Sequence, residues 1–98
     1  MYKTVILSSA QKDVREAALW YNKQQQGLGK RFTSEVRRKV HLIANNPYAY
    51  STKFNEVQAA IIDVFPYMIH FRIDVEYHEI TIIAVLHTSI NPKKWDNR

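Results

Sequence analysis

The chain has 98 residues, no cysteine, and 14 Lys/Arg against 9 Asp/Glu, which gives a formal net charge of +5. A chain of this length forms one domain, so we expect a single domain over residues 1–98. The lack of cysteine excludes a disulfide framework and a thiolate metal site. No apolar run reaches the ~18 residues that would span a bilayer, and the run at 1–7 is too short for a signal peptide. We therefore expect a cytoplasmic protein.

The positive charge is concentrated in the first half of the chain. Residues 1–50 hold nine Lys/Arg and three Asp/Glu, a balance of +6, whereas residues 51–98 hold five and six, a balance of −1. An anionic partner would therefore be attracted to the N-terminal half.

The first predicted elements are a strand and a helix. The β-branched run at 3–7 predicts a strand, and Ser8 is expected to begin a helix, because Ser8 and Gln11 have the spacing of a capping box. Apolar residues then recur at helical spacing through Tyr21. Gly27 is expected to stop this helix, and Gly27 and Gly29 are expected to form a hinge in which both can adopt left-handed dihedrals.

A second amphipathic helix should follow the hinge. One stripe of it is apolar, and the helix should end before the Asn-Asn-Pro sequence at 45–47. Two helices joined by so short a link should form an antiparallel hairpin. The stripe consists of Leu28, Phe32, Val36, Val40 and Ile43.

The pattern of apolar residues in the second half of the chain predicts strands. Strands are expected at 57–65, 68–74 and 80–87, with a weaker one near 53–54. In the 68–74 strand, Ile69, Phe71 and Ile73 should face inward and Met68, His70, Arg72 and Asp74 outward. The order β-α-α-β-β-β predicts an α+β fold, with the helix hairpin on one face of a mainly antiparallel sheet and the other face available to a partner.

The second helix also carries paired cations. Lys30-Arg31 and Arg37-Arg38 are seven residues apart, about two helical turns, so they should share a stripe. They could bind an anionic target or partner, or they could be a solvated helix face.

A few residues in the strands could carry acid–base chemistry. His70 and His87 could be general acid–base groups, because imidazole titrates near neutrality, although an ordinary surface histidine fits each of them as well. Tyr67 could stack on a nucleobase or close the edge of the core, and Trp95 could contact a partner or anchor the C-terminal segment. Metal-ligand spacings and nucleotide-binding motifs are lacking, so neither a metal nor a cofactor is expected.

Several segments resemble the RelE/ParE toxin superfamily, which includes plasmid stabilisation proteins. They are, in chain order, Glu16-Ala17 with Trp20-Tyr21, Gly27-Leu28-Gly29, the Phe-Pro-Tyr segment at 65–71, and residues 84–95. The resemblance implies a toxin that is neutralised by a cognate antitoxin. RelE-like members cut mRNA on the ribosome, whereas ParE-like members poison DNA gyrase and are not nucleases.

The chain departs from the nuclease pattern in the strands. Gln58, Met68 and Ser89 stand where nuclease members place basic residues, and metal-free RNA cleavage needs convergent cations beside an acid–base pair. We therefore favour a gyrase poison without enzymatic activity. One alternative is a ribosome-dependent mRNA endonuclease, for which His87 would be the catalytic group with Arg72, His70, Tyr67 and Lys53 as possible helpers. The other is a non-toxic relic or binding module.

Overall fold

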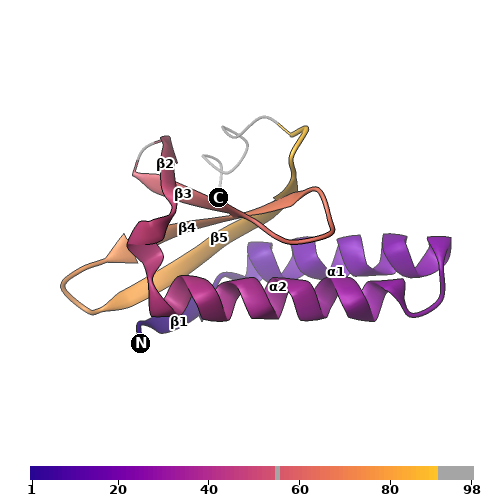
Figure 1. Ribbon diagram of the computed structural model, residues 1–98, viewed down its shortest axis with the longest axis horizontal. Coiled ribbons are helices and arrows are strands. Elements are labelled where there is room, and N and C mark those ends of the chain that lie inside the picture. The colour runs from indigo at the N-terminus through magenta and orange to yellow at the C-terminus, as the bar shows by residue number, and fades with distance from the viewer. Residues whose placement is uncertain (55, 91–98) are drawn as a thin grey trace.

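The computed structural model describes residues 1–54 and 56–90, with only the backbone described at 51–54. It has a helical layer on one face of a five-stranded sheet (Figure 1). The elements are β1 (Lys3–Ile6), α1 (Ser8–Gln24), α2 (Leu28–Asn45), the 3-10 helix η1 (Pro47–Ala49), β2 (Ser51–Phe54), β3 (Val57–Ile61), β4 (Tyr67–Asp74) and β5 (Glu79–His87). The predicted α+β fold with a helix hairpin is confirmed.

The sheet order is β1-β5-β4-β3-β2, and every neighbouring pair is antiparallel except β1 with β5. Strands β5, β4 and β3 each have a partner strand on both sides, and β4 and β5 supply Ile69, Phe71, Ile80 and Ile82 to the centre of the core. Ile83 is an extra residue in β5, since His70 pairs with Ala84 while Phe71 pairs with Ile82.

The main core lies between the sheet and the helices. Phe32 and Ile43 of α2 are fully buried against Ile69 and Phe71 of β4 and Ile80 of β5. The inward set expected for the 68–74 strand is confirmed, as is the apolar stripe of α2, of which Phe32, Val36 and Ile43 are buried and Leu28 and Val40 partly buried.

The start of α1 differs from the prediction. Leu7 is the N-cap residue and no side chain caps the helix. Gln11 instead donates from Nε2 to the Ile6 carbonyl at 3.2 Å. The capping box at Ser8 is therefore wrong: the backbone stays paired through Leu7, whose N–H bonds Ile82 O at 3.0 Å, so Ser8 is already inside the helix.

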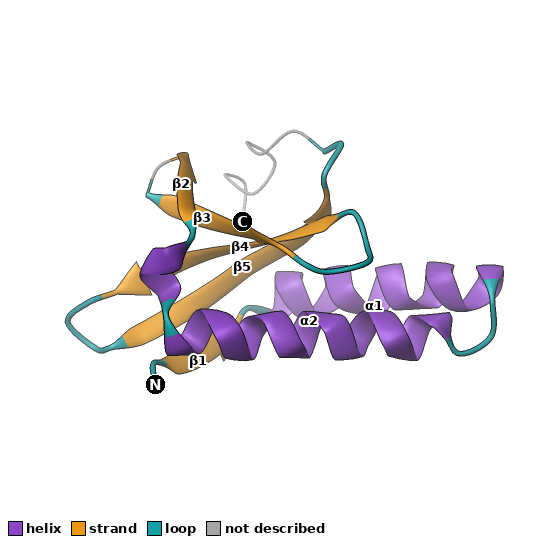
Figure 2. Ribbon diagram, viewed as in Figure 1, coloured by secondary structure: helices purple, strands orange, loops and turns teal. Residues whose placement is uncertain are grey.

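The predicted hinge is also shorter than expected. Helix α1 ends at Gln24, and Gly27, at φ +89°, is the N-cap residue of α2. Leu28 and Gly29 already belong to α2, and Gly29 is buried where the two helices touch. Figure 2 shows the resulting hairpin, which extends beyond the edge of the sheet.

Two expectations for the strands need correction. The strand predicted at 57–65 stops at Ile61. Beyond it, Asp63 forms an ion pair with Arg38 of α2, and Phe65 is buried in the core. These two contacts direct the chain toward the helices instead of along the sheet. The face of the sheet opposite the helices is not fully available, since Val57, Ala84 and Leu86 there are buried in a second apolar cluster. Within the described part of the chain, no helix is long and apolar enough to cross a membrane.

Candidate functional site

A cleft of about 530 Å³ lies between α1 and the carboxyl end of β5. It exists because β1 ends at Ile6, opposite Ile82, so the remaining edge of β5 has no strand beside it. Helix α1 runs along this edge instead. The cleft is lined by Ser9, Lys12, Asp13, Glu16, Ala17, Trp20, Tyr67, Val85, Leu86, His87 and Ile90.

Two polar side chains of α1 take over the bonds that a strand would have made. Ser9 Oγ donates to Ile83 O at 3.1 Å, and Asp13 Oδ2 accepts from the Val85 N–H at 3.0 Å. Ser9 and Asp13 are four residues apart, so they lie on one helix face. These bonds fix the wall of the cleft, because they hold α1 in register with β5.

We expect Asp13→Ala to lower the free energy of unfolding by about 1–3 kcal/mol, because it leaves the partly buried Val85 N–H without its acceptor. Asp13→Asn keeps an acceptor oxygen of the same size and should recover most of the loss. Urea unfolding followed by circular dichroism measures both. Equal stability of Asp13→Ala and the wild type would contradict the role given to this bond.

An aromatic cluster adjoins the cleft at Trp20 and Tyr67, which line it. Tyr21 contacts Phe32, Phe65 and Tyr67, with ring centroids 5.4, 4.8 and 6.0 Å away. Trp20 is 56% exposed and lies edge-on to Tyr21 at 5.1 Å. A second hollow of about 450 Å³ shares Trp20, Tyr67 and His87 with the cleft.

His87 and Tyr67 are neighbours, as the nuclease hypothesis requires. Their rings are 5.4 Å apart, edge to face, and the two residues pair across β5 and β4. Burial raises the pKa of the Tyr67 phenol above its usual 10.0, and Tyr21 and Asp13 raise it further. The phenol is therefore protonated at neutral pH, and it can donate a hydrogen bond but not act as a base.

The imidazole of His87 is held by the turn that follows β5. Ser89 N–H donates to Nδ1 at 3.1 Å, and Ser89 Oγ lies 2.8 Å from the same nitrogen. In the tautomer with the proton on Nε2, Nδ1 accepts from this backbone N–H, and its lone pair is then engaged by Ser89.

Two of the other proposed helpers, His70 and Arg72, lie on the opposite face of the sheet from His87. Along β4 and β5 the registered pairs alternate between faces, so His70 and Arg72 face away from the helices, opposite to Tyr67 and His87. Arg72 is also five residues along β4 from Tyr67, roughly 17 Å. Only the backbone of Lys53 is described, in β2, and Trp95 lies outside the described residues.

His70 corrects the sequence reading in a second way. Of the two interpretations of His70, the ordinary surface histidine is wrong, because this side chain is 4% exposed. Strand alternation predicts the correct face, and Ala84, the β5 partner of His70, belongs to the second apolar cluster on that face.

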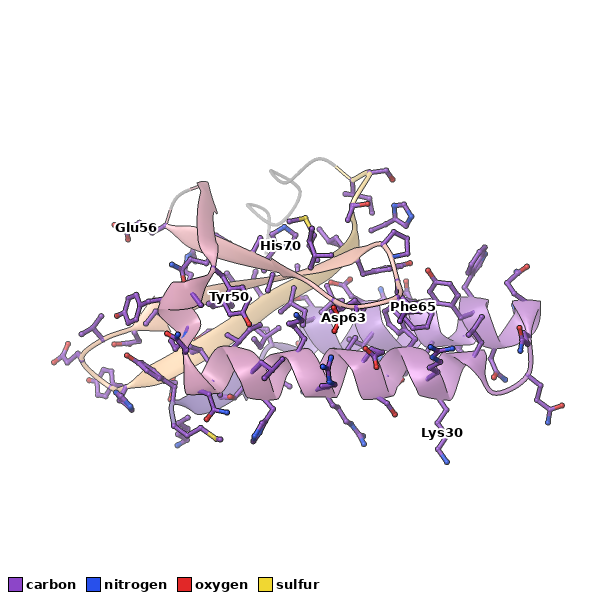
Figure 3. The ribbon with its side chains drawn as sticks, viewed as in Figure 1. Lys30, Tyr50, Glu56, Asp63, Phe65 and His70 are labelled. Atoms are coloured by element: carbon purple, nitrogen blue, oxygen red, sulfur yellow. The ribbon has the colours of Figure 1, made fainter. Side chains whose placement is uncertain are left out.

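The cations predicted on α2 differ in their surroundings. Lys30, Arg31 and Arg37 are exposed, and Lys30 points away from the sheet (Figure 3). Arg38 is also exposed, but it forms an ion pair with Asp63 of the β3–β4 loop and a longer one with Glu35. The hydrogen bond from Arg38 lowers the pKa of Asp63 below its usual value. Arg38 therefore anchors the loop as well as contributing charge.

Sequence reasoning missed Asp13, Glu16 and Trp20 as parts of a site. Their spacing on one helix face was visible, but nothing in the sequence placed that face beside His87. The described walls of the cleft carry one lysine, Lys12, and two carboxylates, Asp13 and Glu16. Lys12 and Glu16 form an ion pair at 3.7 Å.

The chain matches a known protein family over most of its length. Residues 5–92 match the family described as the ParE toxin of the type II toxin–antitoxin system parDE. No curated protein sequence matches the chain.

Solved structures share the fold at low sequence identity. The chromosomal ParDE system from P. aeruginosa superposes with a TM-score of 0.77 at 13% identity, covering 89% of this chain and 96% of that one. The isolated E. coli RelE toxin gives 0.67 at 13% identity, covering 99% and 95%. The intact E. coli RelBE toxin–antitoxin complex gives 0.65 at 15% identity, covering 87% and 94%. Because the family match spans most of the sequence, the chain belongs to the ParE toxin family of type II toxin–antitoxin systems, within the RelE/ParE superfamily.

Proposed function

We propose that this chain is a cytoplasmic toxin that poisons DNA gyrase and is neutralised by a cognate antitoxin seated in the cleft between α1 and β5. The gyrase target follows the ParE-like branch of the family. The antitoxin is proposed because similar folds occur in the ParDE system and in the RelBE complex.

One observation supports gyrase poisoning over RNA cleavage: the charged residues that line the cleft with His87 are mainly acidic. Cleavage of a phosphodiester passes through an anionic phosphorane, which needs several cations close to the acid–base group. Asp13 and Glu16 line the same cleft as His87 instead, and Lys12 is already paired with Glu16. A phosphate entering this cleft would meet more negative than positive charge within its described walls.

The surroundings of the two candidate groups support the same interpretation. Tyr67 keeps its proton because its pKa is raised, and the Nδ1 lone pair of His87 is occupied by Ser89. Neither group is poised to remove the proton of a 2′-hydroxyl.

The cleft suits a segment of an antitoxin for a different reason. It is open and has an exposed indole at its rim and aromatic rings behind it, which favours a partner that inserts an apolar or aromatic side chain. The acidic portion expected of an antitoxin would complement two exposed cations of α2, Arg31 and Arg37, rather than the cleft itself.

The proposal is tested by a supercoiling assay with purified gyrase. The toxin should inhibit supercoiling and accumulate cleaved DNA, and equimolar antitoxin should restore activity. The same preparation should leave mRNA intact on programmed ribosomes. Discrete mRNA cuts that disappear in His87→Ala would establish the nuclease instead, and normal growth on expression would establish the relic or binding module.

A further inference from the structure

A second groove, of about 500 Å³, runs between α1 and α2 on another flank of the hairpin. We call it the outer groove. It shares no residue with the cleft beside β5. It is lined by Gln11, Val14, Arg15, Ala18, Leu19 and Asn22 from α1 and by Lys30 and Thr33 from α2.

The groove has an apolar floor that is incompletely covered. Val14 and Ala18 are partly buried against the core, and Leu19 beside them is 61% exposed. A single exposed leucine on a surface needs no explanation. Leu19 differs because it continues an apolar floor, so a partner seated there would cover all three residues together.

The rim of the groove is cationic. Arg15 stands on α1 and Lys30 on α2, and neither forms an ion pair within residues 1–54 and 56–90. Arg38, farther along α2, is by contrast engaged by Asp63. Charge complementarity therefore calls for a partner with carboxylates on both sides of an apolar side chain.

An apolar floor with a cationic rim fits some classes of partner better than others. A nucleic acid would pair with the two cations but leave the apolar floor exposed. A second copy seated about a twofold axis would bring Arg15 and Lys30 against the same cations of its neighbour. An acidic amphipathic helix satisfies both parts, because it presents an apolar stripe flanked by carboxylates.

The length of the groove fits such a helix. Gln11 to Asn22 covers twelve residues of α1, whose eleven steps along the helix axis rise about 16 Å, or three turns. We propose that the outer groove docks an acidic amphipathic helix of the protein that the toxin poisons, with an apolar side chain on Leu19 and carboxylates on Arg15 and Lys30. This inference rests on the proposed toxin function, and it gives target and antitoxin separate surfaces on the two flanks of α1.

The test compares Leu19→Glu and Lys30→Glu with two matched controls. Leu42 is an exposed leucine of α2 and Lys23 an exposed lysine of α1, and neither lines the outer groove. Leu42→Glu and Lys23→Glu therefore make the same substitutions elsewhere on the hairpin. All four variants are first checked for wild-type circular dichroism and thermal unfolding. Their antitoxin affinity, inhibition of gyrase supercoiling and growth arrest are then measured.

Leu19→Glu and Lys30→Glu should each need at least tenfold more protein than the wild type to inhibit gyrase, with antitoxin affinity unchanged, while both controls inhibit normally. Full inhibition by Leu19→Glu would overturn the inference. So would weakened antitoxin binding with normal inhibition, which would assign the groove to the antitoxin, or loss of a wild-type dimer in sedimentation, which would assign it to self-association.

The failure of the proposed function has a different signature. Wild-type protein that arrests growth without inhibiting gyrase would reject the gyrase target, and the groove would then be judged by growth arrest in the same four variants. Wild-type protein that does neither would reject both proposals.

Discussion

Gly29→Ala is expected to lower the free energy of unfolding by about 2–3 kcal/mol, although alanine favours helix over glycine by about 1 kcal/mol. A Cβ at position 29 would lie 2.3 Å from the carbonyl oxygen of Ala18 and 3.1 Å from Asn22 Cβ. The first of these is backbone, which cannot rotate aside as a side chain could. The two helices would have to separate, which removes contacts along the whole hairpin.

The control is Gly27→Ala. Gly27 has φ +89°, and a Cβ there would meet nothing within 4 Å. The substitution should therefore cost only the left-handed backbone strain, about 1–2 kcal/mol. Urea unfolding of both variants gives the comparison. Gly29→Ala with wild-type stability, or a larger loss at Gly27 than at Gly29, would contradict the close approach at Ala18.

The helices could be predicted because their signals are local. The apolar stripe of α2 follows helical spacing, and burial of Phe32, Val36 and Ile43 follows directly from it. The role of Gly29 could not be predicted in the same way. It depends on contact with Ala18, and that contact is set by the register between the two helices.

The β3–β4 loop shows why an apolar run overstates a strand. Residues 57–65 are nearly all apolar, so period and composition predicted one strand throughout. In the structure, Val64 has φ +75° and is 67% exposed between the anchored Asp63 and the buried Phe65. A β-branched residue with positive φ is strained, and nothing in the sequence signals it.

The site was half predictable. Tyr67 and His87 were both identified, and register across β4 and β5 explains why they meet. The two carboxylates of the cleft, Asp13 and Glu16, were not identified. Asp13 and His87 are separated by more than seventy positions in the sequence. They come together because β1 pairs in parallel with β5 and then stops at Ile6, so α1 takes the place of a strand. Strand order and the end of a strand are tertiary facts that spacing along the chain does not encode.

Trp20→Ala is expected to weaken antitoxin binding by about 30- to 1000-fold, or about 2–4 kcal/mol, the range of an interface hot spot. Trp20 is 56% exposed at the rim of the cleft, and Tyr21 supports its ring from one side at 5.1 Å. A partly supported indole can be covered by a partner with little loss of side-chain freedom, because it has two rotatable bonds. Among the residues beside it, Asp13 and Glu16 are charged and would have to be desolvated, which lessens their contribution.

Isothermal titration with the purified antitoxin measures this effect, and Trp20→Phe is the conservative control. Phenylalanine keeps an aromatic ring but less area, so it should lose less than a third of the free energy that alanine loses. The fold should be unaffected, because the exposed indole adds little to the core, and matching thermal unfolding curves would establish this. If Trp20→Ala bound antitoxin as tightly as the wild type, the cleft would not be the antitoxin-binding site. The proposal that antitoxin and target bind separate surfaces on the two flanks of α1 would then lose its basis.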